Sequence, residues 1–189
     1  KIRHNYEKSN SKSDNKLIKN LVLTGMMGVG KSTIGRSLAS KLSYRFIDID
    51  ELIEKKEGSS INLIFKKKGE NYFRRIENEI TLDQLKKRNV IISLGGGAFM
   101  NRNIRREAKK NSLSFWLDLS TDEIVKRLKK SNKRPLLFNK NLIETINKIY
   151  LDRRRTYNEA SFRIRCNSLK SEEIVNKILL FYEKSRNKI

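Results

Sequence analysis

The sequence predicts an α/β fold in which helices flank a five-stranded parallel sheet. Two observations carry this prediction. Short apolar runs alternate along the chain with longer segments of helical periodicity, and parallel strands need such helices to connect them. At 189 residues the chain also has the size of one domain with a real core, and it contains no run of roughly 20 apolar residues that could span a membrane.

A phosphate-binding loop is predicted between the first strand, residues 21–23, and a helix over residues 32–42. The segment GMMGVGKS, which begins at Gly25, fits the pattern G-x-x-x-x-G-K-[ST] at every fixed position. Glycines let successive backbone N–H groups point at one phosphate cluster, and the following helix adds its positive end. Lys31 can reach the β- and γ-phosphates, and the Ser32 hydroxyl can ligate Mg²⁺. The pattern predicts a nucleoside-triphosphate site; a glycine turn that binds nothing is the alternative.

Two carboxylates are expected at the end of a second strand, residues 44–50. Asp48 and Asp50 are two residues apart, so on an extended chain their side chains point to the same side. Ligands of open parallel sheets bind at the carboxyl ends of the strands, which favours a functional pair. The alternative is that the acidic pair only opens a helix over residues 51–56.

The next segment predicts two helices, residues 60–68 and 70–88, separated by Gly69. One face of the second helix is apolar: Phe73, Ile76 and Ile80. Arg74 and Glu77 lie beside that face at a spacing of three, and the default interpretation of such a pair is a surface ion pair.

A third strand is expected over residues 90–94, followed by Gly95, Gly96 and Gly97. Three glycines at the carboxyl end of a strand allow a ligand to approach the backbone closely. A plain turn is the alternative, although a two-residue turn needs fewer glycines.

The rest of the chain continues the alternation. Helices are predicted over residues 101–110, 120–130, 141–158 and 171–185, and strands over residues 113–119 and 161–166. Ser120 and Glu123 have the spacing of a capping box at the start of their helix. The intervening residues 131–140 contain the only proline and read as a loop, which beside a nucleotide site is a candidate lid.

The chain is strongly basic, with 43 Lys and Arg against 21 Asp and Glu and a formal net charge of +22. Such a charge attracts polyanions whatever the fold. However, the basic residues are spread along the chain without an aromatic-interleaved RNA-binding pattern, and Lys, Asn and Ile dominate even featureless stretches. We therefore attribute the positive charge mainly to a genome-wide drift in amino-acid composition. We expect no nucleic-acid partner and no membrane partner.

Compartment signals are few. The single cysteine, Cys166, excludes an intramolecular disulfide and suits a reducing compartment, so a cytoplasmic location is expected. The single histidine, His4, lies in a polar tail, which argues against histidine-based catalysis and a histidine-rich metal site. Residues 1–19 are polar and basic without the apolar core of a secretory signal, and a disordered tail is expected there.

Taken together, these motifs resemble the shikimate kinases, from about residue 20 to the C-terminus. The segments that carry the resemblance are GMMGVGKSTIGRSLA, FIDIDELIE, INLIFKKKGENYFRRIENE, SLGGGA, RPLL and RRRTYNEA. The resemblance implies a phosphate-loop kinase of the nucleoside-monophosphate-kinase type over residues 20–189, with substrate-binding helices and a lid loop. It also implies transfer of the γ-phosphoryl of ATP to the 3-hydroxyl of shikimate, in the biosynthesis of chorismate and aromatic amino acids. A monomer is expected.

On the nucleotide side, the resemblance assigns ATP binding to Gly28, Val29, Gly30, Lys31, Ser32, Thr33, Arg127 and Arg134. Ser32 would bind Mg²⁺ directly and Asp48 through water. Arg127 would lie near the adenine, and Arg134 would reach the phosphates from the lid. The resemblance gives catalytic roles to Lys31, Asp50 and Arg134.

On the acceptor side, the resemblance implies that Asp50 binds the shikimate hydroxyls and acts as the base. Arg74 and Arg153 would clamp the carboxylate of shikimate. Phe65 and Phe73 would line the apolar side of the shikimate ring. The backbone of Gly95, Gly96 and Gly97 would contact the hydroxyls of shikimate. Arg153, Arg154 and Arg155 all precede Tyr157, and the spacing from this tyrosine selects Arg153.

Three rival functions stand beside this one. A non-catalytic relative of the family is one, although such relatives lose motif residues and this chain keeps them all. A gluconate or nucleotide kinase could use the same scaffold, although a nucleotide acceptor would need a base-binding pocket. A nucleic-acid-binding protein could retain the phosphate loop, but it would need a coherent basic surface.

Overall fold

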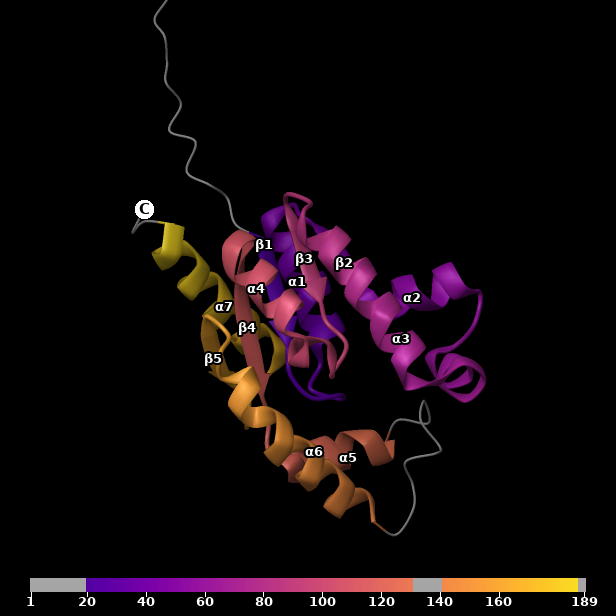
Figure 1. Ribbon diagram of the computed structural model, residues 1–189. Helices are drawn as coiled ribbons and strands as arrows, with labels where there is room; N and C mark the ends of the chain where they lie inside the picture. The colour runs from indigo at the N-terminus through magenta and orange to yellow at the C-terminus, as the bar shows by residue number, and fades with distance from the viewer. Residues whose placement is uncertain (1–19, 131–140, 187–189) are drawn as a thin grey trace, which may run out of the picture.

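The computed structural model describes residues 20–130 and 141–186, which form one sheet and its covering helices. The strands lie in the order β2-β3-β1-β4-β5, and every neighbouring pair is parallel (Figure 1). The strands are β1 (Asn20–Thr24), β2 (Arg45–Asp48), β3 (Val90–Ser93), β4 (Ser112–Asp118) and β5 (Phe162–Arg165). The predicted fold class is therefore confirmed.

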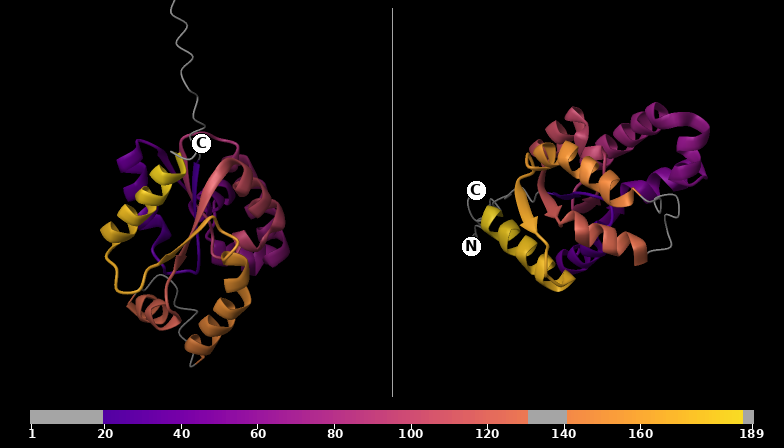
Figure 2. Two further views of the ribbon diagram at one scale, coloured as in Figure 1. Left: turned by 90° about the vertical axis from the view of Figure 1, so that its left-hand side faces the viewer. Right: turned by 90° about the horizontal axis from the view of Figure 1, so that it is seen from below.

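The helices cover both faces of the sheet. They are α1 (Lys31–Leu42), α2 (Ile49–Glu57), α3 (Ile61–Leu85), α4 (Arg102–Asn111), α5 (Thr121–Lys130), α6 (Leu142–Tyr157) and α7 (Ser171–Arg186), with a 3₁₀ turn η1 (Ala98–Met100). Helices α1 and α7 pack together on one face, and α3 and α4 pack together on the other (Figure 2). Helices α5 and α6 pair with each other beyond the carboxyl ends of the strands (Figure 1).

Burial along the strands explains their composition. Every residue of β1, β3 and β4 is buried, as expected for strands covered on both faces. The strands β2 and β5 lie at the edges and contain exposed residues. The uninterrupted apolar runs seen in the sequence are therefore the interior strands of the sheet.

Helix boundaries follow local chemistry. Ser60 caps α3 by accepting a hydrogen bond from the Leu63 backbone N–H, and Gly69 interrupts this helix with a φ of 81°, so the predicted break is present. The predicted capping box differs in detail. The backbone N–H of Ser120 donates to the Asn167 side chain instead of to Glu123, although α5 begins where expected.

The strand boundary at the two aspartates was predicted wrongly. Strand β2 ends at Asp48, and Asp50 lies in the first turn of α2 instead of on the strand. The Asp48 carboxylate caps α2 by accepting from the backbone N–H groups of Asp50 and Glu51, at 3.0 and 3.3 Å. Such a cap satisfies N–H groups that a helix start leaves unpaired, so the chain leaves the sheet at Asp48. The acidic pair therefore does open a helix, and its functional role stays a prediction.

Some predicted features fall outside the described residues. These are the basic tail over residues 1–19 and the candidate lid over residues 131–140, which includes Arg134. Within the described ranges, no helix is both long enough and apolar enough to cross a membrane.

Candidate active site

Three sequence motifs meet at the carboxyl edge of the sheet. The strands β2, β3 and β1 are neighbours in that order. Asp48 is the last residue of β2, the three glycines follow β3, and the phosphate loop follows β1. Strand order therefore brings together segments that lie far apart in the sequence, at the edge where parallel α/β sheets bind ligands.

The phosphate loop has the backbone that its glycines predict. Gly30 precedes α1 with a φ of 96°, a left-handed conformation that side chains disfavour. The helix therefore begins at Lys31, and its N-terminal N–H groups face the loop. The Lys31 ammonium donates to the backbone carbonyls of Gly25 and Met26, both at 2.9 Å. This geometry places a fixed positive charge over the loop.

Ser32 and Asp48, the two residues expected to hold Mg²⁺, are in direct contact in the structure. The Ser32 hydroxyl donates to Asp48 Oδ2 at 2.5 Å, and Oδ1 of the same carboxylate caps α2. Mg²⁺ prefers oxygen ligands and usually takes one or two carboxylates together with phosphates and water. This hydroxyl and carboxylate at a phosphate loop fit that requirement. Within the described ranges, no group of three or more His, Cys, Asp or Glu side chains forms a larger metal cluster.

Arg127 reaches the phosphate loop from α5. Its Nη1 atom donates to the carbonyl of Val29 at 3.2 Å, which places the guanidinium beside Gly30. The structure thus brings Arg127 to the nucleotide side of the site. Gly28 lies in the same loop with a φ of 77°, and Thr33 follows Ser32 on α1.

On the acceptor side, two charged side chains approach the glycine turn, which is defined here as Gly95, Gly96 and Gly97. A Cβ atom on Gly97 would lie 2.6 Å from Arg74 Nη1, and one on Gly95 would lie 2.7 Å from Asp50 Oδ1. A side chain at either position would therefore displace the charged end of Arg74 or Asp50. The plain-turn alternative does not explain these close approaches.

Glu77 is a buried partner of Arg74 in the site, although the spacing of the two residues predicted a surface ion pair. Its side chain is only 3% exposed, and Oε2 accepts from Arg74 Nη1 at 2.7 Å. The other oxygen, Oε1, has no hydrogen-bond partner in the described structure and lies beside Gly95. Burial raises the pKa of Glu77, and the Arg74 guanidinium opposes this shift. A signal was present in the sequence: Glu77 is in helical register with the buried Phe73 and Ile80.

The guanidinium of Arg74 is oriented by two carboxylates. In addition to Glu77, Glu70 Oε1 accepts from Arg74 Nε at 3.3 Å. The guanidinium also lies 5.2 Å from the centroid of the Phe73 ring, which itself packs against Phe65 at 4.6 Å between centroids. An apolar ring pair and a positioned cation are thus adjacent on α3.

Arg153 meets the glycine turn from α6. Its Nη1 atom donates to the carbonyl of Gly96 at 2.9 Å. Arg153 is partly buried, whereas Arg154 and Arg155 are exposed. The structure therefore brings Arg153, and neither of its neighbours, to the acceptor side.

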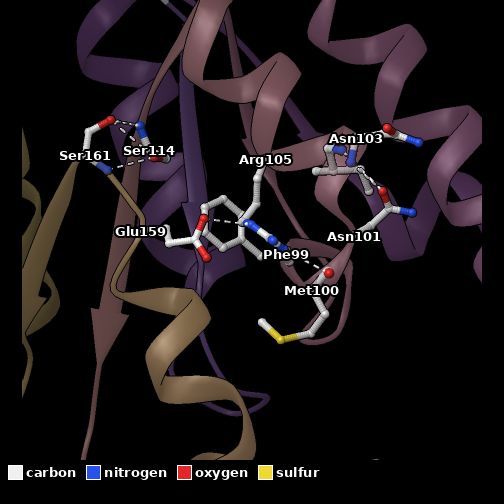
Figure 3. Close-up of polar contacts among 9 residues, drawn as sticks. Phe99, Met100, Asn101, Asn103, Arg105, Ser114, Glu159 and Ser161 are labelled. Atoms are coloured by element: carbon white, nitrogen blue, oxygen red, sulfur yellow. Dashed lines mark hydrogen bonds and ion pairs between the residues drawn. The ribbon is translucent and has the colours of Figure 1, made fainter.

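The segment after the glycine turn is held by Arg105 of α4 (Figure 3). Nη1 of this arginine donates to the carbonyls of Phe99 and Met100, at 2.8 and 2.9 Å. Its Nε atom donates to Glu159 Oε2 at 3.0 Å, just beyond the end of α6. Arg105 thus links η1 to the chain that follows α6.

The comparison with known families agrees with this geometry. The family model for shikimate kinase matches residues 27–183. The chain belongs to the shikimate kinase family. The resemblance inferred from its motifs is therefore confirmed, as is the prediction of a phosphotransferase that uses ATP.

Individual relatives are similar over most of the chain. The shikimate kinase of Sulfurihydrogenibium sp. is 42% identical over 162 residues, covering 86% of this chain and 96% of that protein. The shikimate kinase of Acinetobacter baumannii, solved in complex with shikimate, is 29% identical with a TM-score of 0.84, covering 90% of this chain and 96% of that one. The structure from Aquifex aeolicus is 37% identical with a TM-score of 0.78, covering 88% and 97%.

Proposed function

We propose that this protein transfers the γ-phosphoryl of ATP to the 3-hydroxyl of shikimate, as a step in aromatic amino-acid biosynthesis. One observation carries the assignment beyond family membership. Arg74, Arg153 and Asp50 converge on the glycine turn, beside the phosphate loop. Shikimate carries a carboxylate and several hydroxyls, so two guanidinium groups and one carboxylate match its chemistry. Gluconate carries the same groups, but it has no ring for the Phe65 and Phe73 pair to contact, and the family match favours shikimate. A nucleotide acceptor would need a base-binding pocket.

The residues on the nucleotide side would position ATP and supply positive charge to its phosphates. Lys31 and the N-terminal N–H groups of α1 would hold the β- and γ-phosphates. Ser32 would hold Mg²⁺ directly and Asp48 through a water molecule. The bound ion would neutralise charge on the phosphates. Arg127 at the adenine side and Arg134 on the lid complete the proposed nucleotide contacts.

The acceptor side would orient the hydroxyl that attacks. Asp50, at the start of α2, would accept the hydrogen bond of the 3-hydroxyl and take its proton as the new bond forms. The carboxylate of shikimate would bind Arg74, which Glu70 and Glu77 already orient, together with Arg153. The Phe65 and Phe73 ring pair would contact the apolar side of the shikimate ring.

A coupled assay of ADP release tests the proposal. With ATP and Mg²⁺ present, shikimate should support turnover, while gluconate and nucleoside monophosphates should not. Turnover with gluconate or a nucleotide in place of shikimate would contradict the assignment of the acceptor.

Replacing Arg74 by lysine should weaken shikimate binding roughly tenfold or more, because an ammonium cannot make the planar two-point contact to a carboxylate. Affinity for ATP should stay nearly unchanged. Titration of each ligand by calorimetry measures both effects. The matched control is Arg75→Lys, since Arg75 is an exposed neighbour on the same helix. Equal loss of both affinities in Arg74→Lys would show that the assignment is wrong.

Deletion of residues 1–19 should leave the activity intact at moderate salt, because the tail carries charge and no site motif. The cut must spare Asn20, whose side chain accepts from the Val90 backbone N–H and donates to the Lys87 carbonyl. Removing Asn20 as well should lower the midpoint of thermal unfolding. A folded but inactive truncation at residue 19 would show that the tail contributes to the site.

The expectations of a cytoplasmic monomer without a nucleic-acid partner stay predictions.

A further inference from the structure

Tyr157 is buried at the centre of the site without a role in the proposed chemistry. It is the last residue of α6 and has no exposed surface. Its ring packs against Trp116 of β4, with 5.8 Å between centroids, and its hydroxyl lies 3.9 Å from the sulfur of Met26 in the phosphate loop. A buried phenol needs a partner for its O–H, and here the hydroxyl donates to the carbonyl of Gly96.

The same carbonyl accepts a second hydrogen bond, from Nη1 of Arg153 at 2.9 Å. Arg153 and Tyr157 are four residues apart on α6, so both side chains leave one face of the helix. A carbonyl oxygen has two lone pairs. The Tyr157 hydroxyl takes one of them, which leaves the other for the guanidinium of Arg153. The two groups also touch each other, since a hydrogen bond with Arg153 lowers the pKa of Tyr157 against the larger, opposite effect of burial.

Gly96 also lies where the two halves of the site meet. A Cβ atom on this residue would be 3.5 Å from the backbone nitrogen of Met27 and 3.7 Å from the carbonyl of Gly25, both in the phosphate loop. The tyrosine hydroxyl therefore fixes the turn at the point where the acceptor side touches the nucleotide side. Arg105, which also binds Glu159, holds the following segment through the Phe99 carbonyl (Figure 3).

We propose that Tyr157 is a positioning residue for the acceptor, which acts by fixing Arg153. Its hydroxyl occupies one side of the Gly96 carbonyl, confines the Arg153 guanidinium to the other side, and so presents the remaining N–H groups of the arginine to the carboxylate of the substrate. The hydroxyl itself does not touch substrate. This inference rests on the proposed function, because it takes Arg153 to bind shikimate.

The variant Tyr157→Phe removes the hydroxyl and keeps the ring that packs on Trp116. The KM for shikimate should rise roughly fivefold, as expected for loss of one hydrogen bond that orients a binding group, while the KM for ATP should change less than about twofold. The matched control is Tyr182→Phe. Tyr182 is also fully buried, but its hydroxyl pairs with Tyr44 instead of with the turn. This control should leave both KM values unchanged.

A double-mutant cycle with Arg153→Ala separates positioning from general structure. In the Arg153→Ala background, Tyr157→Phe should cause no further rise in the KM for shikimate, because no guanidinium remains to be positioned. If the two substitutions multiply instead, Tyr157 acts independently of Arg153 and the inference is overturned. Reversible partial unfolding would raise the apparent KM for ATP as well as for shikimate, so an unchanged KM for ATP keeps the cycle readable if the variants are less stable. Absence of any activity with shikimate in the wild type would instead overturn the proposed function, and this inference with it.

Discussion

Replacing Lys31 by alanine is expected to lower kcat by about 10³-fold or more, because the variant loses a positive charge that stabilises the transferring phosphoryl group. The structure supports this expectation through the position of the ammonium. It lies over the phosphate loop, 2.9 Å from two carbonyls of that loop, at the first residue of α1. Steady-state kinetics with saturating ATP and shikimate measures the loss.

Lys41→Ala is the matched control for this experiment. Lys41 lies in the last turn of the same helix, is exposed, and is far from the N-terminal end that faces the loop. Its replacement removes the same charge from the chain and should leave kcat unchanged. A Lys31→Ala variant within tenfold of the wild type would remove Lys31 from the mechanism.

Replacing Asp50 by asparagine is expected to reduce kcat by about 10²-fold or more, with ATP affinity intact. The amide keeps the shape and one acceptor oxygen of the side chain, but it loses the charge and the basicity. The Asp50 carboxylate lies beside Gly95, on the acceptor side of the site, so its loss should not reach the nucleotide. If phosphoryl transfer passes through a loose transition state, part of the fall reflects lost orientation of the hydroxyl.

Asp48→Asn provides the contrast. It should raise the Mg²⁺ concentration needed for half-maximal activity, which a titration of activity against Mg²⁺ measures. Helix α2 should survive the change, since asparagine is as good an N-cap as aspartate. If Asp50→Asn alters only the Mg²⁺ dependence and Asp48→Asn only the shikimate dependence, the two roles are reversed.

The sequence was sufficient for the sheet and the phosphate loop because both depend on local patterns. Apolar runs predicted the buried strands, and glycine spacing predicted the loop that precedes α1. The end of β2 was missed for a specific reason. Alternation of side chains continues through Asp50, but the Asp48 carboxylate satisfies the first N–H groups of α2 and ends the strand two residues earlier.

Contacts between segments that are far apart in the sequence could not be predicted from local patterns. The spacing of Glu77 from Arg74 is typical of an ion pair on a helix surface, so the sequence predicted an exposed pair. In the structure Glu77 is buried, because α3 packs against the glycine turn. Similarly, Tyr157 served only as a marker of spacing. Its bond to Gly96, 61 residues away in the sequence, depends on how α6 lies across the end of the sheet.

The identity of the product tests the central claim most directly. The wild-type protein, incubated with ATP, Mg²⁺ and shikimate, should form one phosphate ester and an equal amount of ADP, and phosphorus–proton NMR should place that phosphate on the 3-oxygen of shikimate. Phosphate on another hydroxyl would contradict the placement of Asp50. Release of ADP without any phosphorylated shikimate would contradict the proposed function itself.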